Sequence, residues 1–138
     1  MIFNTGHLKP EKFQLHEARA KADESFCNCS SAEFMSNFPV FDGWKPENES
    51  PILLKLKNVE PHSDPWVGRS KEPRARRAIF WLLEGGGQNG FGYKLIFGCG
   101  AKHIKMVPGD FVVFNDRIDH WVMSEKLWRG AAIQLVTI

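Results

Sequence analysis

Cysteine and tyrosine are scarce in this chain: three Cys and one Tyr occur among 138 residues. An odd and small number of cysteines argues against a disulfide framework. The C-N-C spacing of Cys27 and Cys29 is also too tight for the usual C-x-x-C metal or redox pair. We therefore expect free thiols, a reducing compartment and a cytoplasmic protein.

Long apolar runs and strong net charge are missing as well. No run approaches the ~20 residues that a membrane helix needs, and the N-terminal residues MIFNTGHLKPEKF lack the basic start and apolar stretch of a secretory signal. We therefore expect no membrane partner. A net charge of +2 does not by itself indicate nucleic acid. The length fits one domain, residues 1–138, which can bury a core without disulfides or a structural metal.

The first fifty residues are typical of a helical cover. Residues 10–26 are rich in helix formers, with Pro10 where a first turn tolerates proline and Glu11 close behind it. Residues 30–38 begin with serines that can cap a short helix. The sequence therefore predicts one or two N-terminal helices packed outside the main fold.

From residue 52 the hydrophobic period changes to two. Alternating or doubly apolar segments separated by turn signals, such as GGGQNG at 85–90, predict short strands. Such strands without intervening helices indicate an antiparallel sandwich or barrel over residues 51–138. The predicted strands are 52–59, 76–84, 91–98, 101–107, 111–115, 120–124 and 128–138.

A group of metal-ligating side chains is the first candidate site. His62 and Asp64 continue the even-numbered face of the strand that begins at Ile52, so both can bind one ion. For a third ligand we prefer His120, because the alternation places His103 outward. Two histidines and a carboxylate suit Fe(II) and leave coordination positions open. Zinc is the rival metal, and the alternative is an ordinary polar turn.

Arg129 is the second candidate. It shares a strand face with apolar residues at 131, 133 and 135, and arginine is rarely buried without a partner. The partner is a carboxylate, either of a ligand or of the protein. The acids nearest in sequence are Asp110, Asp116, Asp119 and Glu125.

Taken in order, the motifs resemble those of a known enzyme family. PHSDPW, IFWLLE, KLIFG, IKMVPGDFVVFND, DHWV and WRGAAIQL follow one another from residue 61 onward. This pattern resembles the double-stranded β-helix of the 2-oxoglutarate- and Fe(II)-dependent oxygenases. The family signature is H-x-D, a distal histidine, then Arg or Lys roughly ten residues later. Here His120 lies 56 residues after Asp64, and Arg129 lies nine after His120.

The resemblance implies a fold and a set of roles. The fold would be a jelly-roll or cupin-like double-stranded β-helix. His62, Asp64 and His120 would bind Fe(II), Arg129 would pair with the distal carboxylate of 2-oxoglutarate, and Tyr93 would hydrogen-bond the cosubstrate. Tyr93 as a core residue is the alternative. Dioxygen would be the oxidant, and a small molecule, peptide or nucleobase would be hydroxylated or demethylated.

A basic segment follows the H-x-D motif directly. WVGRSKEPRARR, residues 66–77, carries one acid against five bases: Arg69, Lys71, Arg74, Arg76 and Arg77. It is a candidate lid or a surface for an acidic substrate, nucleic acid included. The alternative is a solvated loop.

Two other functions remain open at this point. VPGDFVVFNDRIDHWV also resembles the second cupin motif, which would make the chain a metal-binding protein or isomerase, although the first cupin motif has H-x-H rather than H-x-D. The other alternative is a non-catalytic β-sandwich adaptor in which His62 and Asp64 are incidental.

Overall fold

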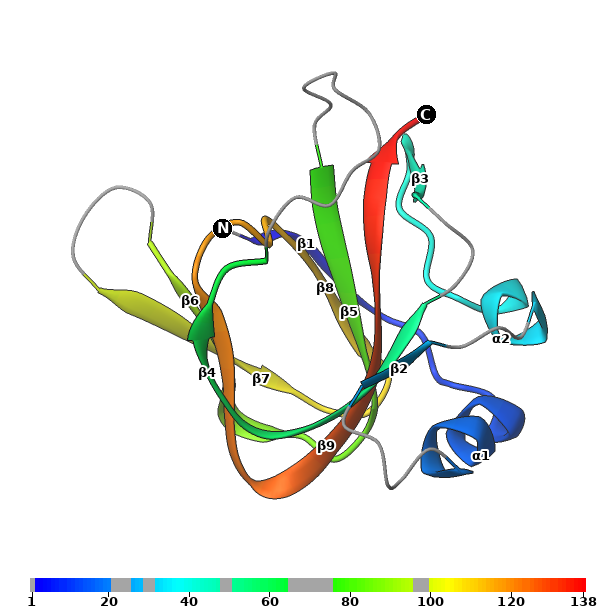
Figure 1. Cartoon of the computed structure of the whole chain (residues 1–138), viewed down its shortest axis with the longest axis horizontal. Helices are drawn as coiled ribbons and strands as arrows, with labels where there is room; N and C mark the ends of the chain where they lie inside the picture. The colour runs from blue at the N-terminus through cyan, green and yellow to red at the C-terminus, as the bar shows by residue number, and fades with distance from the viewer. Residues whose placement is uncertain (1, 21–25, 29–31, 48–50, 65–75, 96–99) are drawn as a thin grey trace.

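A computed structural model describes residues 2–20, 26–28, 32–47, 51–64, 76–95 and 100–138 (Figure 1). The described chain is mainly β, with two short helices, as the sequence predicts. Every strand pairing is antiparallel. The strands are β1 (Ile2–His7), β2 (Phe26–Asn28), β3 (Trp44–Pro46), β4 (Ile52–His62), β5 (Arg76–Glu84), β6 (Gly87–Lys94), β7 (Ala101–Met106), β8 (Asp110–Phe114) and β9 (His120–Thr137); the helices are α1 (Lys12–Ala20) and α2 (Ala32–Ser36).

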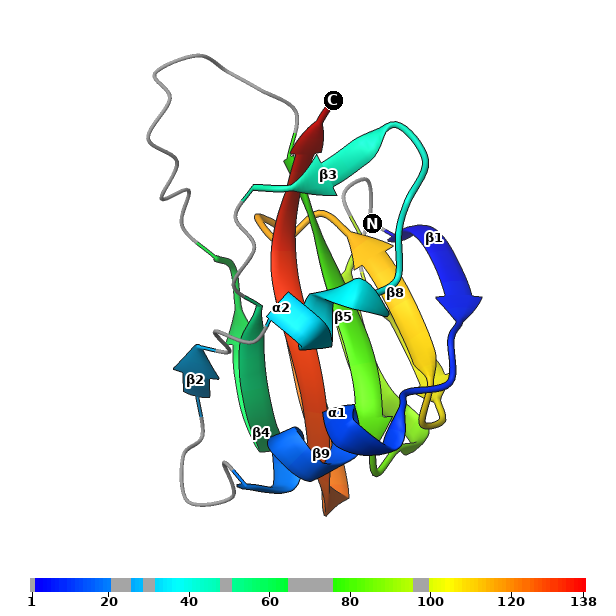
Figure 2. The same ribbon diagram turned by 90° about the vertical axis from the view of Figure 1, so that its right-hand side faces the viewer.

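The sheet is curled, because its two longest neighbouring strands each contribute to two walls. The first half of β4 pairs with the second half of β9, which also pairs with β5, and β5 pairs with β8. We call these strands the helix-covered wall, because α1 and α2 lie across their outer face (Figure 2). Strands β1, β2 and β3 pair with β8, β4 and β9 respectively.

The opposite wall is made by the end of β4, the start of β9, β6 and β7. Past a register shift after Leu56, β4 pairs with the first residues of β9, and His62 lies opposite His120. The same first residues of β9 pair with β6, which pairs in turn with β7. Bulges of this kind bend a strand and increase its twist, and this one coincides with the transition from one wall to the other.

Apolar side chains fill both faces of the helix-covered wall. The outer core lies between that wall and the helices, and the inner core lies between the two walls. Central strands with two buried faces read as continuous apolar runs, as β5 does. The outer core contains Ala18, Phe34, Phe38, Leu53, Ile79, Trp81, Leu83, Val113, Ala131, Ile133 and Leu135. The inner core contains Ala78, Phe80, Leu82, Phe91, Met106, Val112, Phe114, Val122 and Trp128.

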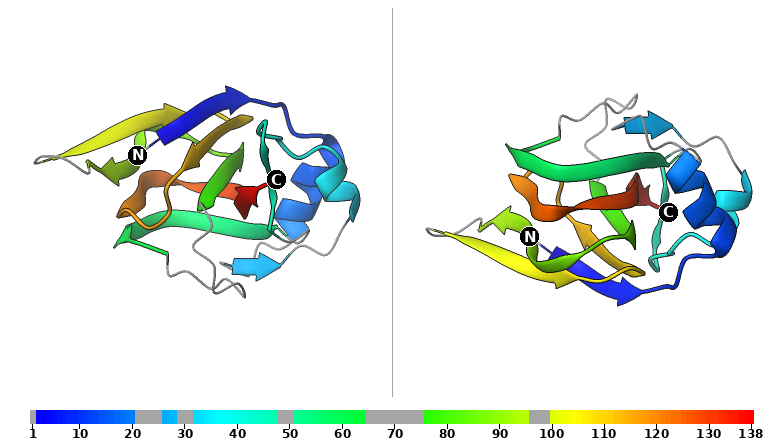
Figure 3. Two further views of the ribbon diagram at one scale, coloured as in Figure 1. Left: turned by 90° about the horizontal axis from the view of Figure 1, so that it is seen from above. Right: turned by 90° about the horizontal axis from the view of Figure 1, so that it is seen from below.

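The curled sheet leaves an opening on one side. Seen from above and below, β1 and β7 lie along the same side of the molecule (Figure 3). A groove runs between them, lined by the end of β1 and most of β7 with residues of β8. Within the described ranges, β7 pairs with β6 alone, so the sheet is an open half-barrel there. No helix in those ranges is long and apolar enough to cross a membrane.

Several predicted elements need correction. The two strands predicted at 120–124 and 128–138 are one strand, β9, and β6 begins inside the predicted turn at 85–90. The N-terminal region is also less helical than predicted, since it contributes β1, β2 and β3. Each of these short strands pairs with a strand that is distant in the sequence. Their conformation therefore depends on long-range partners more than on local pattern.

Candidate metal centre

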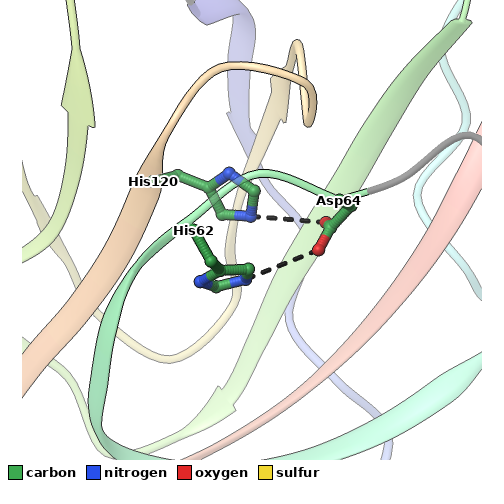
Figure 4. A group of neighbouring side chains, drawn as sticks. All are labelled: His62, Asp64 and His120. Carbon is green, nitrogen blue, oxygen red and sulfur yellow. Dashed lines mark ion pairs between the residues drawn. The ribbon is translucent and has the colours of Figure 1, made fainter.

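The structure brings together the three predicted metal ligands. His62 ends β4, His120 begins β9, and the two are partners in register. Asp64 follows His62 by two residues, and its backbone N–H donates to the carbonyl of Asp116 at 2.7 Å. One ligand atom of each side chain lies within 4.8 Å of the others. Figure 4 shows both imidazoles directed at the Asp64 carboxylate.

The spacing of these atoms fits a bound cation. His62 Nε2 lies 3.5 Å from Asp64 Oδ1, and His120 Nε2 lies 3.3 Å from Asp64 Oδ2. An ion held at about 2.0–2.2 Å from each ligand places neighbouring ligand atoms about 3–3.5 Å apart. Each histidine therefore lies at a ligand-to-ligand distance from the Asp64 carboxylate, and the three side chains could hold one metal ion.

The tautomers of both histidines favour the same conclusion. His62 Nδ1 lies 2.9 Å from the carbonyl of Glu60, and His120 Nδ1 lies 2.8 Å from the carbonyl of Ile118. A carbonyl oxygen only accepts, so each Nδ1 carries a hydrogen and a neutral ring presents the Nε2 lone pair. Two lone pairs facing a carboxylate need a positive charge between them, from a proton or a metal. Backbone carbonyls fix metal-binding histidines in this way.

The centre is buried on one side and open on the other. His120 is 9% exposed, and its ring lies 4.9 Å from Phe114 and 6.4 Å from Phe91 between ring centroids. Burial lowers the pKa of His120, but hydrogen bonds to Asp64 and to the Ile118 carbonyl, with the charges of Asp64 and Asp116, leave it raised overall. His62 and Asp64 are 42% and 41% exposed, so ligands can approach from their side.

A second carboxylate supports the centre, and sequence reasoning assigned it no such role. Asp116 is 4% exposed. Its carbonyl holds the backbone of Asp64, and its Oδ2 accepts a hydrogen bond from Gln134 at 2.9 Å. The one feature of the sequence that points to this supporting role is that Asp116 lies four residues before His120. Gln134 carried no signal, because its neighbours in sequence are apolar.

Arg129 lies on the other side of the sheet from the centre. Its alternation partners Ala131 and Ile133 belong to the outer core, whereas Trp128 belongs to the inner core. The Arg129 Nε atom lies 3.5 Å from Glu84 Oε2. The prediction that Arg129 shares a face with apolar residues is confirmed, but the structure does not bring it to the metal ligands. Its carboxylate partner is Glu84, none of the four acids considered above.

A bulge explains why Glu84 can reach Arg129. The register shifts between Leu82 and Glu84, so two residues of β5 lie opposite one of β9 and the alternation of side chains is interrupted. Glu84 also receives two hydrogen bonds from Arg19 of α1, at 3.0 and 3.1 Å. Glu84 thus links α1 to the helix-covered wall.

This ion-pair network predicts an acid-dependent loss of stability. The hydrogen bond from Arg19 lowers the pKa of Glu84, and burial of the carboxyl group opposes this effect. The positive charges of Arg19 and Arg129 lower the pKa further. A lowered folded-state pKa contributes stability above the unfolded value of about 4.3, and this contribution is lost as the pH falls through the folded value. Glu84→Gln should therefore flatten the fall in unfolding free energy below about pH 4.3, measured by urea denaturation.

The matched control for this prediction is Glu60→Gln. Glu60 is exposed on β4 and has no ion pair within the described residues. Its substitution should leave the pH dependence unchanged. Identical curves for wild type and Glu84→Gln would contradict the role given to the network.

Tyr93 lies beside the metal ligands. It is the register partner of His120 on β6, and it packs against the inner core. Its side chain is partly buried against that core, and its role towards a cosubstrate stays a prediction. His103 is exposed as predicted, and its Nε2 accepts a hydrogen bond from Trp121 Nε1 at 3.3 Å.

Of the five basic residues predicted to form a surface, the structure describes the side chain of one, Arg77. Arg69, Lys71 and Arg74 lie outside the described residues, as does the side chain of Arg76. The guanidinium of Arg77 stacks on aromatic rings, 3.8 Å from the centroid of Phe3 and 4.2 Å from that of Trp44. Arg77 is therefore engaged within the fold, and its part in a nucleic-acid surface stays a prediction.

Comparisons with known proteins leave the family open. No family model matches the chain, and no curated protein matches it. Among solved structures, the crystal structure of protein NMB1881 from Neisseria meningitidis aligns with a TM-score of 0.39 and 13% identity, covering 77% of this chain and 94% of that one.

Proposed function

We propose that the chain is a mononuclear non-haem Fe(II) oxygenase that uses 2-oxoglutarate and dioxygen to hydroxylate or demethylate a substrate. The observation that carries the proposal is the convergence of His62, Asp64 and His120, with both Nε2 atoms presented by fixed tautomers. Two histidines and one carboxylate on one side of an ion form the facial set of non-haem Fe(II) oxygenases. When bound, the iron would supply the oxidative chemistry.

The strand pairing supports a double-stranded β-helix as the scaffold of this function. Strands β4 and β9 each enter both walls, and the remaining strands divide between the walls. This arrangement places His62 and His120 side by side where β4 ends and β9 begins. Rigid strands hold such ligands more precisely than loops do.

The protein's own residues would position and shield the reaction. Phe91 and Phe114 pack around His120 and exclude water from the buried side of the centre. Asp116 holds the backbone of Asp64 and so orients its carboxylate. The open side, next to His62 and Asp64, is where a cosubstrate and a substrate would enter.

The test is an anaerobic titration. Metal-free protein receives Fe(II), then 2-oxoglutarate, and the visible spectrum is followed for the charge-transfer band of a chelated 2-oxo acid. We expect the band in wild type and its loss in His120→Ala. Bound iron without the band would favour a metal-binding protein that does not use 2-oxoglutarate. A failure to bind any divalent metal would overturn the proposal.

A further inference from the structure

Asp116 is a buried carboxylate on the inner side of the curled sheet. It lies in the turn between β8 and β9, four residues before His120, and 4% of it is exposed. Its Oδ2 accepts a hydrogen bond from the Gln134 side chain at 2.9 Å. Because side chains alternate along β9, Gln134 projects to the same side as Ala132, which packs against the inner core. The Asp116 carboxylate therefore lies between the two walls, as does the ring of His120, which packs against Phe114 of the inner core.

Within the described part of the chain, this carboxylate has an amide partner and no cationic one. The ion pairs of the described residues all join other groups. The Asp64 N–H donates to the backbone carbonyl of Asp116 and not to its side chain. A buried charge is costly unless it is paired or lies at a metal. The fold therefore keeps a buried negative charge that no described lysine or arginine balances.

The charge of Asp116 acts on the candidate metal ligands. Burial lowers the pKa of His120, and the negative charges of Asp64 and Asp116 are among the effects that raise it overall. Both carboxylates are thus within electrostatic reach of the same imidazole. The Nδ1 hydrogen bonds of His62 and His120 fit neutral rings. With these rings neutral, the two carboxylates contribute two negative charges, which a divalent cation would balance.

We propose that Asp116 supplies the second negative charge of the metal centre from outside the ligand set. Its carboxylate is absent from the group of ligand atoms that His62, Asp64 and His120 bring within 4.8 Å of one another, so it would stabilise a bound divalent cation through space. This role of the side-chain charge is separate from that of the Asp116 backbone carbonyl, which holds Asp64. The inference rests on the proposed function only for the presence of a divalent metal, and it involves no cosubstrate.

The test is a neutral replacement of nearly the same shape. Asp116→Asn removes the charge and keeps the backbone carbonyl and a side-chain oxygen that can accept from Gln134. Asp119→Asn is the matched control, because it removes the same charge one residue before His120, where the side chain is partly exposed. Two quantities are measured for each protein: the dissociation constant of Co(II), followed by its visible absorption, and the urea denaturation of the metal-free form.

We expect Asp116→Asn to weaken Co(II) binding by about 10–100-fold, as is usual for groups just outside a ligand set. The visible spectrum of the saturated protein should not change, because the three ligands stay the same. Without metal, the variant should resist urea as well as wild type or better, since it lacks an unbalanced buried charge. A merely structural role would instead lower metal affinity and stability together. Asp119→Asn should change neither, because water screens a partly exposed charge.

Each contrary outcome has a distinct meaning. Equal Co(II) affinity of Asp116→Asn and wild type, or an equal loss in Asp119→Asn, would overturn the role of the Asp116 charge and leave the metal centre intact. A metal-free Asp116→Asn protein that is unfolded or less stable than wild type would also overturn it, because the carboxylate would then have its partner within the protein. A changed spectrum at saturation would make Asp116 a ligand and overturn a role outside the ligand set. Wild type that binds no Co(II) would overturn the metal centre, and this inference with it.

Discussion

Asp64→Ala is expected to abolish the stabilisation of this protein by a divalent metal. Partners in the outer shell of a metal already contribute about 10–100-fold to affinity, so loss of a direct ligand should weaken binding by more than about 100-fold. At a metal concentration 100 times the wild-type dissociation constant, wild type should gain about 2.7 kcal/mol in unfolding free energy. The variant should gain almost none, as measured by denaturant unfolding with and without Fe(II) under anaerobic conditions.

Asp110→Ala is the matched control for this prediction. Asp110 also pairs with a histidine, at 2.7 Å from His7 Nδ1, and it lies outside the three-residue group. Its replacement should leave the gain from metal intact. The metal-free proteins should also be compared. Asp64→Ala removes no contact of the buried core, so without metal the variant and the wild type should have similar unfolding free energies. A metal-dependent gain that survives in Asp64→Ala would contradict the assigned centre.

Among the substitutions considered, Trp81→Ala should cause the largest loss of unfolding free energy. Trp81 is fully buried in the outer core, with ring centroids 6.2 Å from Phe34 and 5.5 Å from Phe38. Its Nε1–H donates to the carbonyl of Leu8 at 2.9 Å. Truncating a buried tryptophan costs about 3–5 kcal/mol, a large part of the stability of a small domain. Equilibrium denaturation of the metal-free protein measures the loss.

Trp81→Phe separates packing from hydrogen bonding at the same position. It keeps a ring against Phe34 and Phe38 but leaves the Leu8 carbonyl without this donor, so we expect a smaller loss of about 1–3 kcal/mol. Metal affinity should be unchanged, because the outer core and the centre lie on opposite faces of the sheet. A change of metal affinity in Trp81→Phe would show coupling between the faces that the structure does not predict.

Much of the architecture was predictable from local pattern. The period of two after residue 52 predicts the strands, and β5 agrees with its prediction at both ends. The N-terminal strands β1, β2 and β3 were missed, because short pairing segments with mixed polarity carry little signal of their own. The continuity of β9 was also missed, because Lys126 and its polar neighbours resemble a turn.

The grouping of the three candidate metal ligands was predictable for a physical reason. His62 and Asp64 lie two residues apart on an extended segment, and alternation alone directs both side chains to one face. His120 was preferred over His103 by the same rule, and His103 is indeed exposed. Asp116 and Gln134, which support the centre, act through a carbonyl and a contact between distant strands. Neither contact has a local signature.

The position of Arg129 is what the sequence by itself could not determine. The sequence determined which residues share a face with it, namely Ala131, Ile133 and Leu135. It could not determine where that face points, because both faces of this part of β9 are apolar. Only the tertiary structure decided in which direction that face points. Helices cover one face of the strand and the opposite wall covers the other, so both faces pack against protein. Arg129 therefore faces Glu84, on the side of the sheet away from the candidate metal ligands.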